Sequence, residues 1–132
     1  NTANQIFKPI IFFAYQENEP IAASLCFKGK DILYGRHWGA LKKVSNLHFE
    51  CCYYQGIDYC IKNNIACFDP GVQGEHKIRR GFEPKLTYSF HYFLNKDFEE
   101  AVKKYCRSER AQIKNYLEAC KRYTPFNINY KI

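Results

Sequence analysis

The chain has 132 residues, enough to bury one hydrophobic core, and we expect a single domain over residues 1–132. Hydrophobic residues make up 46% of it and aromatic residues 17%, a composition that excludes a disordered segment. The net charge of +7 at pH 7 predicts an anionic partner, such as nucleic acid, an acidic membrane surface or a phosphorylated cofactor.

The sequence lacks a membrane-spanning run, a methionine and a CxxC pair, and each absence supports an expectation. No apolar run approaches the roughly 20 residues that cross a bilayer, so we expect no membrane span. There is no methionine, and we expect the chain to be part of a longer protein. Seven cysteines without a CxxC pair predict no metal site, because structural zinc needs four converging ligands at short spacings. Reduced, mostly buried thiols favour a cytoplasmic protein.

The first forty residues predict an antiparallel meander of three strands. Residues 9–15, 21–28 and 31–38 are short runs rich in β-branched and aromatic residues, and tight turns separate them. The clearest hairpin turn is KGKD at residues 28–31, where glycine permits the backbone conformation that the turn needs.

A helix and a parallel strand are expected next. Residues 49–61 carry an apolar stripe at helical spacing, with Cys52 and Cys60 on its inner face, and Ser45 or Asn46 can cap the start. Residues 65–69 then form a short buried strand. Because a helix between two strands is a crossover, this strand should lie parallel to the third strand of the meander.

The last third of the chain predicts another strand and a long helix. Residues 86–94 alternate as a strand does, residues 97–122 are amphipathic with a possible capping box from Asp97 and Glu100, and residues 126–130 can add a last strand. The order β-β-β-α-β-β-α-β predicts an α+β fold with a mixed sheet. The helix residues expected to face inward are Phe98, Ala101, Val102, Tyr105, Ile113, Leu117 and Cys120.

The stretch FDPGVQGEHKIRRGFEP, residues 68–84, combines glycines with positive charge. Asp69 ends the parallel strand, at the edge where α/β sheets bind ligands. Gly71 and Gly74 let the backbone approach a ligand and point N–H groups at it, before a helical turn over residues 75–80. A solvated basic turn is the alternative to an anion site. The side chains that can bind phosphate are Lys77, Arg79 and Arg80.

Glu50 is a candidate general base. At 100° per residue it falls inside the apolar sector of the predicted helix, where burial would raise the pKa of its carboxyl. A base with such a pKa can take a proton from an amine. The alternative is a structural ion pair with Arg36 or Arg80, because an unpaired buried carboxylate is costly.

Other candidate catalytic side chains belong to the same predicted sheet edge or loop. Tyr34 begins the sequence YGRHWG at the end of the third strand, on the edge that should also carry Asp69. His76 lies within the glycine loop. His37 is more often a half-buried structural histidine than a catalyst.

Three stretches resemble a known bacterial family. LYGRHWG, LHFECCYYQGIDYCI and FDPGVQGEHKIRRGFEP are similar to peptidoglycan biosynthesis/recognition proteins over about residues 20–95. That family is grouped with acyl-CoA N-acyltransferases of the GNAT type and is distantly similar to the FemABX aminoacyl transferases. The resemblance implies a GNAT-like fold whose parallel strands splay at residues 34–38 and 65–69 to hold a phosphorylated donor.

The resemblance further implies acyl or aminoacyl transfer to an amine, possibly of a cell-wall precursor. The GNAT pyrophosphate pattern Q/R-x-x-G-x-G/A is absent, so the implied donor is either a CoA thioester or aminoacyl-tRNA. The first strand and two helices of a GNAT domain have no counterpart, so we expect the C-terminal portion of such a domain, with a possible homodimer through the exposed sheet edge. The competing hypothesis is a non-catalytic module that binds anionic glycan or RNA.

Overall fold

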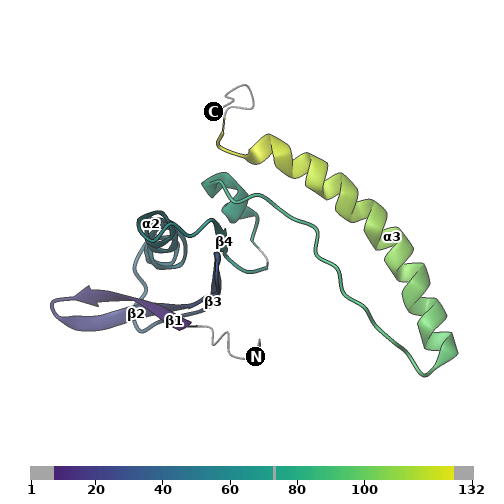
Figure 1. Cartoon of the computed structure of the whole chain (residues 1–132), viewed down its shortest axis with the longest axis horizontal. Helices are drawn as coiled ribbons and strands as arrows, with labels where there is room; N and C mark the ends of the chain where they lie inside the picture. Colours follow the sequence, from purple (N-terminus) through teal and green to yellow (C-terminus); the bar gives the residue numbers. More distant parts are fainter. Residues whose placement is uncertain (1–7, 73, 127–132) are drawn as a thin grey trace. The chain divides into compact units, whose positions relative to one another are not determined.

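The computed structural model describes residues 8–72 and 74–126, and Figure 1 draws its elements. The chain divides into two compact units, of which the first ends at Gln73 and the second begins at Gly74. The division falls inside the glycine loop, and each unit is described by itself. A single domain over residues 1–132 stays a prediction.

A four-stranded sheet is the framework of the first unit. Its strands lie in the order β1 (Lys8–Gln16), β2 (Glu19–Lys28), β3 (Ile32–Ala40) and β4 (Cys67–Asp69). The pairs β1–β2 and β2–β3 are antiparallel, whereas β3 and β4 are parallel. The predicted meander and the predicted parallel strand are both confirmed.

Both hairpins close through tight turns. Glu17 and Asn18, between β1 and β2, have positive φ angles of 50° and 72°, as a two-residue turn that matches the strand twist requires. Between β2 and β3 the N–H of Gly29 donates to the carbonyl of Ile32 at 2.8 Å. The turn predicted at residues 28–31 is therefore confirmed.

A helix connects β3 to β4 and packs on one face of the sheet (Figure 1). It consists of α1 (Leu47–Phe49), a π-helical turn η1 (Glu50–Tyr54) and α2 (Gln55–Lys62). The hydroxyl of Ser24 on β2 donates to the carbonyl of Cys51 at 2.6 Å and joins the sheet to η1. The core between helix and sheet contains Cys26, Leu33, Cys60 and Ile65.

Phe68 occupies a slot between α2 and β3. A Cβ on Gly56 of α2 would lie 2.5 Å from two atoms of the Phe68 ring, and a Cβ on Gly35 of β3 would lie 3.6 Å from a third. Neither glycine has a positive φ, so the ring, not the backbone conformation, requires a residue without a side chain at Gly56. Phe68 thereby fixes the distance between helix and sheet.

The second unit contains a 3₁₀ turn η2 (Glu75–Arg80), the helix α3 (Lys96–Cys120) and a short turn η3 (Lys121–Tyr123). In Figure 1 an extended stretch leads away from η2, and α3 returns toward it. Ile78 of η2 and Cys120 of α3 are both buried, and the Phe126 ring lies against Gly81. The long C-terminal helix is confirmed.

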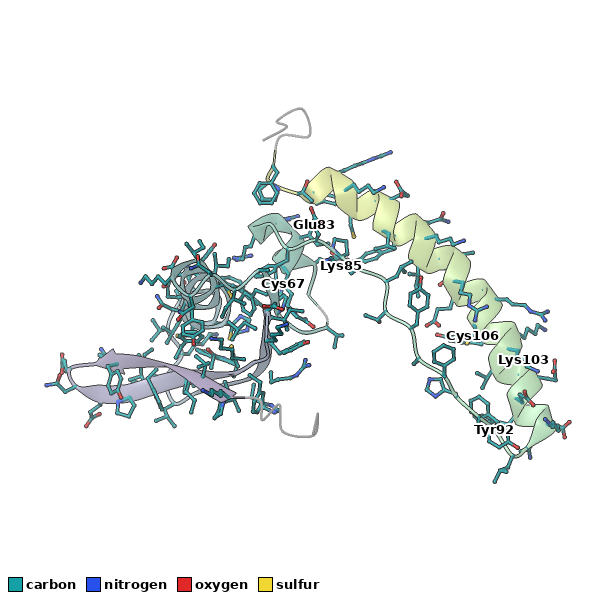
Figure 2. All side chains as sticks on the ribbon, viewed as in Figure 1. Cys67, Glu83, Lys85, Tyr92, Lys103 and Cys106 are labelled. Atoms are coloured by element: carbon teal, nitrogen blue, oxygen red, sulfur yellow. The ribbon has the colours of Figure 1, made fainter. Side chains whose placement is uncertain are left out.

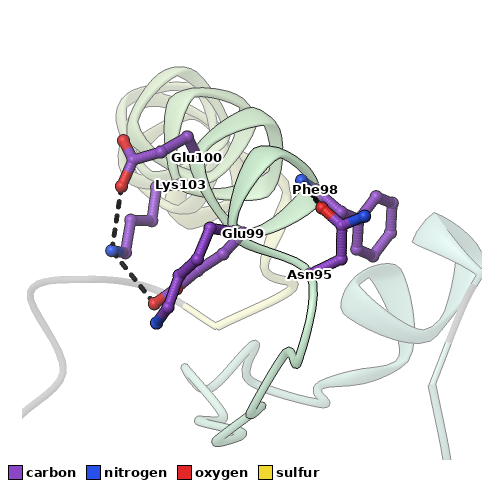
Figure 3. A network of polar contacts seen from close by, with 6 residues as sticks. Asn95, Phe98, Glu99, Glu100 and Lys103 are labelled. Atoms are coloured by element: carbon purple, nitrogen blue, oxygen red, sulfur yellow. Dashed lines mark hydrogen bonds and ion pairs between the residues drawn. The ribbon is translucent and has the colours of Figure 1, made fainter.

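The start of α3 differs from the prediction. Asn95 is the N-cap, and its Oδ1 accepts the N–H of Phe98 at 2.9 Å (Figure 3). The capping box predicted from Asp97 and Glu100 is therefore wrong, because the N-cap lies two residues before Asp97. Glu99 and Glu100 instead both pair with Lys103 at 3.1 Å. Exposed pairs of this kind add little stability.

Two predictions about packing in the second unit are also wrong. Residues 86–94 are extended but form no strand in the described chain, because no neighbouring strand pairs with them, and Phe90 is 97% exposed. Of the helix residues predicted to face inward, only Cys120 is buried, while Phe98 and Tyr105 are 56% and 66% exposed. Figure 2 shows these side chains, with Tyr92 labelled on the extended stretch and Cys106 on α3.

The α+β class and the mixed sheet are confirmed, whereas the likeness to the GNAT fold stays a prediction. The last strand predicted at residues 126–130 falls almost entirely outside the described residues. Within residues 8–72 and 74–126, no helix has both the length and the apolar character needed to cross a membrane.

Candidate functional site

Tyr34 and Asp69 are brought together at the end of the parallel ladder. They are the last paired positions of β3 and β4. The preceding pair, Leu33 and Phe68, packs against the helix, so the alternation of strand side chains puts Tyr34 and Asp69 on the opposite face. Both are half-buried. The prediction that these two residues share a sheet edge is confirmed.

Beyond this pair β3 continues to Ala40, while β4 ends. No described strand pairs with residues 36–40 on that side. The chain after β4 instead crosses over Gly35, where a Cβ would lie 3.5 Å from the Cα of Pro70. The parallel ladder therefore opens at Tyr34 and Asp69, at the carboxyl end of β4 and partway along β3.

An irregularity in the sheet places Arg36 beside this opening. The register of β2 with β3 shifts between Leu25 and Cys26, which leaves Arg36 as an extra residue on β3. Bulges of this kind redirect side chains and are common next to active sites. The guanidinium carbon of Arg36 lies 5.4 Å from the centre of the Tyr34 ring, a cation–π contact.

The carboxylate of Asp69 closes its own turn. The N–H of Gly71 donates to Asp69 Oδ1 at 2.8 Å, and Gly71 has a positive φ of 83°. This N–H is therefore bonded within the chain. The glycine pattern had predicted instead that it would point outward at a ligand. One carboxylate oxygen of Asp69 thus has a structural role, although the residue is paired with Tyr34 in the parallel ladder.

Glu50 does not occupy the buried position predicted for it. It is exposed, and its Oε1 accepts a hydrogen bond from Gln55 Nε2 at 2.8 Å. The π-helical turn is the reason: the N–H of Gln55 donates to the carbonyl of Glu50, five residues back, so each residue turns through less than 100°. The stripe of buried residues at the start of the helix is displaced by one residue. Cys51 is therefore buried, whereas Cys52 had been predicted to be.

An aromatic cluster beside this turn was missed by the sequence reasoning. The His48 ring makes edge contacts with Trp38 at 5.5 Å, with Phe49 at 5.5 Å and with Tyr53 at 5.4 Å between ring centres. His48 thus contacts both η1 and the part of β3 that extends beyond β4. The signal in the sequence is weak, because the contact with Trp38 depends on the sheet register.

The basic turn of the second unit has the predicted backbone. Gly74 and Gly81 flank η2 with φ angles of 98° and 88°, conformations that glycine adopts without strain. Arg80 Nη1 donates to the carbonyl of His76 at 2.9 Å, so this arginine stabilises its own turn. Arg79 is exposed, whereas Lys77 is half-buried. Lys77, Arg79 and Arg80 thus differ in exposure and in hydrogen bonding, although the sequence pattern did not distinguish them.

His76 lies in a setting that disfavours its charge. Partial burial, together with the positive charges of Arg80 and Lys77, lowers the pKa of His76 below its ordinary value. The imidazole is therefore neutral near pH 7 and can accept a proton. Its ring also covers Gly74, where a Cβ would lie 2.5 Å from the imidazole Cε1.

We expect stability to depend on pH through His76. As the pH falls below 6.5, the unfolded chain takes up this proton before the folded chain does, so the free energy of unfolding decreases until the pH passes the lowered folded pKa. Chemical denaturation between about pH 7.5 and pH 5 should show the decrease. The variant His76→Gln should show a smaller one, and an equal decrease in both proteins would contradict the assignment.

The described residues contain no group of three His, Cys, Asp or Glu side chains that could hold a metal ion. All seven cysteines are free thiols. Burial, followed by the neighbouring Cys60, raises the pKa of the Cys26 thiol to about 11. Such a thiol is unreactive near neutral pH, so Cys26 belongs to the core and not to the candidate site.

Comparison with known proteins places the chain in a family. A family model described as FemAB-like, peptidoglycan biosynthesis/recognition, matches residues 3–128. No curated protein and no solved structure matches the chain. The match includes both units and every candidate residue above, and it connects the function with peptidoglycan. The chain belongs to the FemAB-like family of peptidoglycan biosynthesis and recognition proteins.

Proposed function

We propose that this chain transfers an acyl or aminoacyl group from a phosphorylated donor to an amine of a cell-wall precursor. Family membership supports the cell-wall acceptor. The observation that carries the proposal is the pairing of Tyr34 with Asp69 on one face, at the point where β3 continues without β4. Ligands of sheets with parallel strands bind at this carboxyl edge.

Transfer to an amine requires two proton movements. The amine nitrogen attacks the donor carbonyl, a C–N bond forms, and the C–S bond of a thioester or the C–O bond of an ester breaks. We assign the amine proton to the carboxylate of Asp69, whose Oδ1 also holds the Gly71 N–H. The Tyr34 hydroxyl then supplies a proton to the leaving sulfur or oxygen. Positioning of the donor and the amine contributes the rest of the rate enhancement.

Glu50 and His76 are the other candidate bases. Glu50 is exposed and its Oε1 accepts a hydrogen bond from Gln55 Nε2, so it lacks the burial on which its prediction as a base rested. His76 is neutral near pH 7 because its pKa is lowered. We therefore place Asp69 first, His76 second and Glu50 third.

The basic turn is proposed to contact the donor's phosphates. The contributing groups are the backbone at Gly74 and the side chains of Lys77, Arg79 and Arg80. Because Arg80 Nη1 already bonds to the His76 carbonyl, we expect Lys77 and Arg79 to contribute most of the charge. Both a CoA thioester and aminoacyl-tRNA carry phosphates, and the chemistry of the turn suits either.

Donor binding and transfer together test this proposal. The chain would be titrated calorimetrically with CoA and with a tRNA acceptor-stem RNA over a series of salt concentrations. For the RNA, each phosphate contact removed by Lys77→Gln or Arg79→Gln should reduce the slope of log K against log salt by about 0.7 to 0.9. Binding of neither donor, together with no labelled product from acyl-CoA or aminoacyl-tRNA, would refute the transfer function.

A binding module without catalysis is the second candidate, and one observation favours it. Tyr88, Phe90 and Tyr92 are between 82% and 97% exposed on the extended stretch before α3. Aromatic rings in such positions stack on nucleic-acid bases, and the positive charge of the chain attracts phosphate. Salt-sensitive RNA binding that is lost in the variant Phe90→Ala, without any transfer product, would support this function instead.

A further inference from the structure

The second unit contains a small pocket between η2 and the end of α3. Its volume is about 210 Å³, and its apolar floor includes Ile78 and Cys120, which are 8% and 2% exposed. Glu75 and Arg79 line it from η2, and two phenol side chains line it from the other side. The space corresponds to roughly seven water molecules at about 30 Å³ each, which suits a ligand smaller than a drug-sized molecule.

Glu75 and Arg79 bring opposite charges to this pocket without pairing. None of the ion pairs within the described residues joins them. In an α-helix, positions four apart share a face and a Glu–Arg pair forms readily. In the 3₁₀ turn, with three residues per turn and a rise of about 2 Å per residue, they point about 120° apart and lie about 8 Å apart along the axis.

Two phenol side chains, Tyr116 of α3 and Tyr123 of η3, line the pocket beside these charges. The neighbouring Cys120 thiol, followed by desolvation and the Glu75 carboxylate, raises the pKa of Tyr116 above its ordinary value. The phenol therefore stays protonated near pH 7. Glu75 and Arg79 thus bring one negative and one positive side chain to a pocket whose other lining residues are apolar or neutral.

We infer that this pocket binds a small zwitterion, a free amino acid. The ligand's ammonium group would contact Glu75, its carboxylate would contact Arg79 through paired N–H donors, and an apolar side chain would lie on Ile78 and Cys120. A ligand with both charges satisfies both groups, whereas phosphate would meet the negative charge of Glu75. The inference concerns the second unit alone and does not depend on the transfer reaction.

The test compares three small ligands by calorimetry and by NMR of the whole chain. Alanine carries both charges, N-acetylalanine lacks the cation and alaninamide lacks the anion. We expect alanine to bind in about the millimolar range and each analogue at least about tenfold more weakly. Backbone shifts should be confined to residues 75–81 and 116–123. No saturable binding of alanine at about 10 mM, or equal binding of the three, would overturn the inference.

Matched variants separate this pocket from a phosphate site on the same turn. Glu75→Gln removes the charge but keeps the size of an exposed side chain, so the unit should remain folded. It should weaken alanine binding about tenfold and leave or strengthen the binding of inorganic phosphate. Arg79→Gln should weaken both ligands, while Lys77→Gln, outside the pocket, should weaken phosphate alone. If Lys77→Gln and Arg79→Gln reduce alanine binding equally, general attraction to positive charge explains it and the pocket assignment fails.

Discussion

The variant Gly56→Ala should destabilise the first unit by about 1–3 kcal/mol, although alanine is the better helix former by about 1 kcal/mol. The new Cβ would stand 2.5 Å from Cε1 and Cζ of Phe68, closer than carbon atoms approach. The ring cannot move far, because it lies between α2 and β3. Denaturation followed by circular dichroism would measure the change in the free energy of unfolding.

Gly39→Ala is the matched control for this experiment. A Cβ on Gly39 has no neighbour within 4 Å and the residue is exposed, so its effect should stay within about 0.5 kcal/mol. Combining Gly56→Ala with Phe68→Leu should cost less than the two changes added separately, because the smaller side chain makes room. If Gly56→Ala instead stabilised the protein, as helix propensity alone predicts, the packing of Phe68 against α2 would be refuted.

The meander and the crossover could be predicted because their signals are local. Short runs rich in β-branched and aromatic residues mark β1, β2 and β3, and the KGKD turn fixes the second hairpin. The parallel pairing of β3 with β4 follows from one helix standing between two strands. From these elements alone, Tyr34 and Asp69 could be placed on one edge of the sheet.

The environment of Glu50 could not be predicted, because a π-helical turn has no sequence signature. The buried residues Cys51, Gly56 and Cys60 are spaced by five and then by four. A wheel drawn at 100° per residue agrees with Gly56 and Cys60, which follow the π turn. Before that turn, the wheel is out of register with the structure by one residue. For this reason it wrongly placed Glu50 in the apolar sector.

Residues 86–94 and the basic turn show a different limit. Alternation in the sequence predicts which side chains would lie on the same face of a strand. A strand forms, however, only where a neighbouring strand supplies backbone hydrogen bonds. No described residue supplies them to residues 86–94. In the turn, the positive φ angles of Gly71, Gly74 and Gly81 agree with the glycine pattern. The use of Arg80 to bind the His76 carbonyl depends on a side-chain conformation that composition does not specify.

If Asp69 is the base, the variant Asp69→Asn should lose transfer activity by about 100-fold or more while the protein remains folded. The amide oxygen of asparagine can still accept the Gly71 N–H that Asp69 Oδ1 accepts now, so the turn after β4 is retained. The amide cannot take a proton from the attacking amine. The rate of labelled product formation with whichever donor binds would measure the loss.

Asp69→Ala and Glu50→Gln complete this comparison. Alanine removes both the base and the acceptor, so it should lose activity and also about 0.5–1.5 kcal/mol of stability. Glu50 is exposed and contacts only Gln55 among the bonds described for its side chain, so Glu50→Gln should keep most of the rate. An Asp69→Asn protein with unchanged activity would show that the carboxylate serves only to close the turn at Gly71, and the base would then have to be sought at His76.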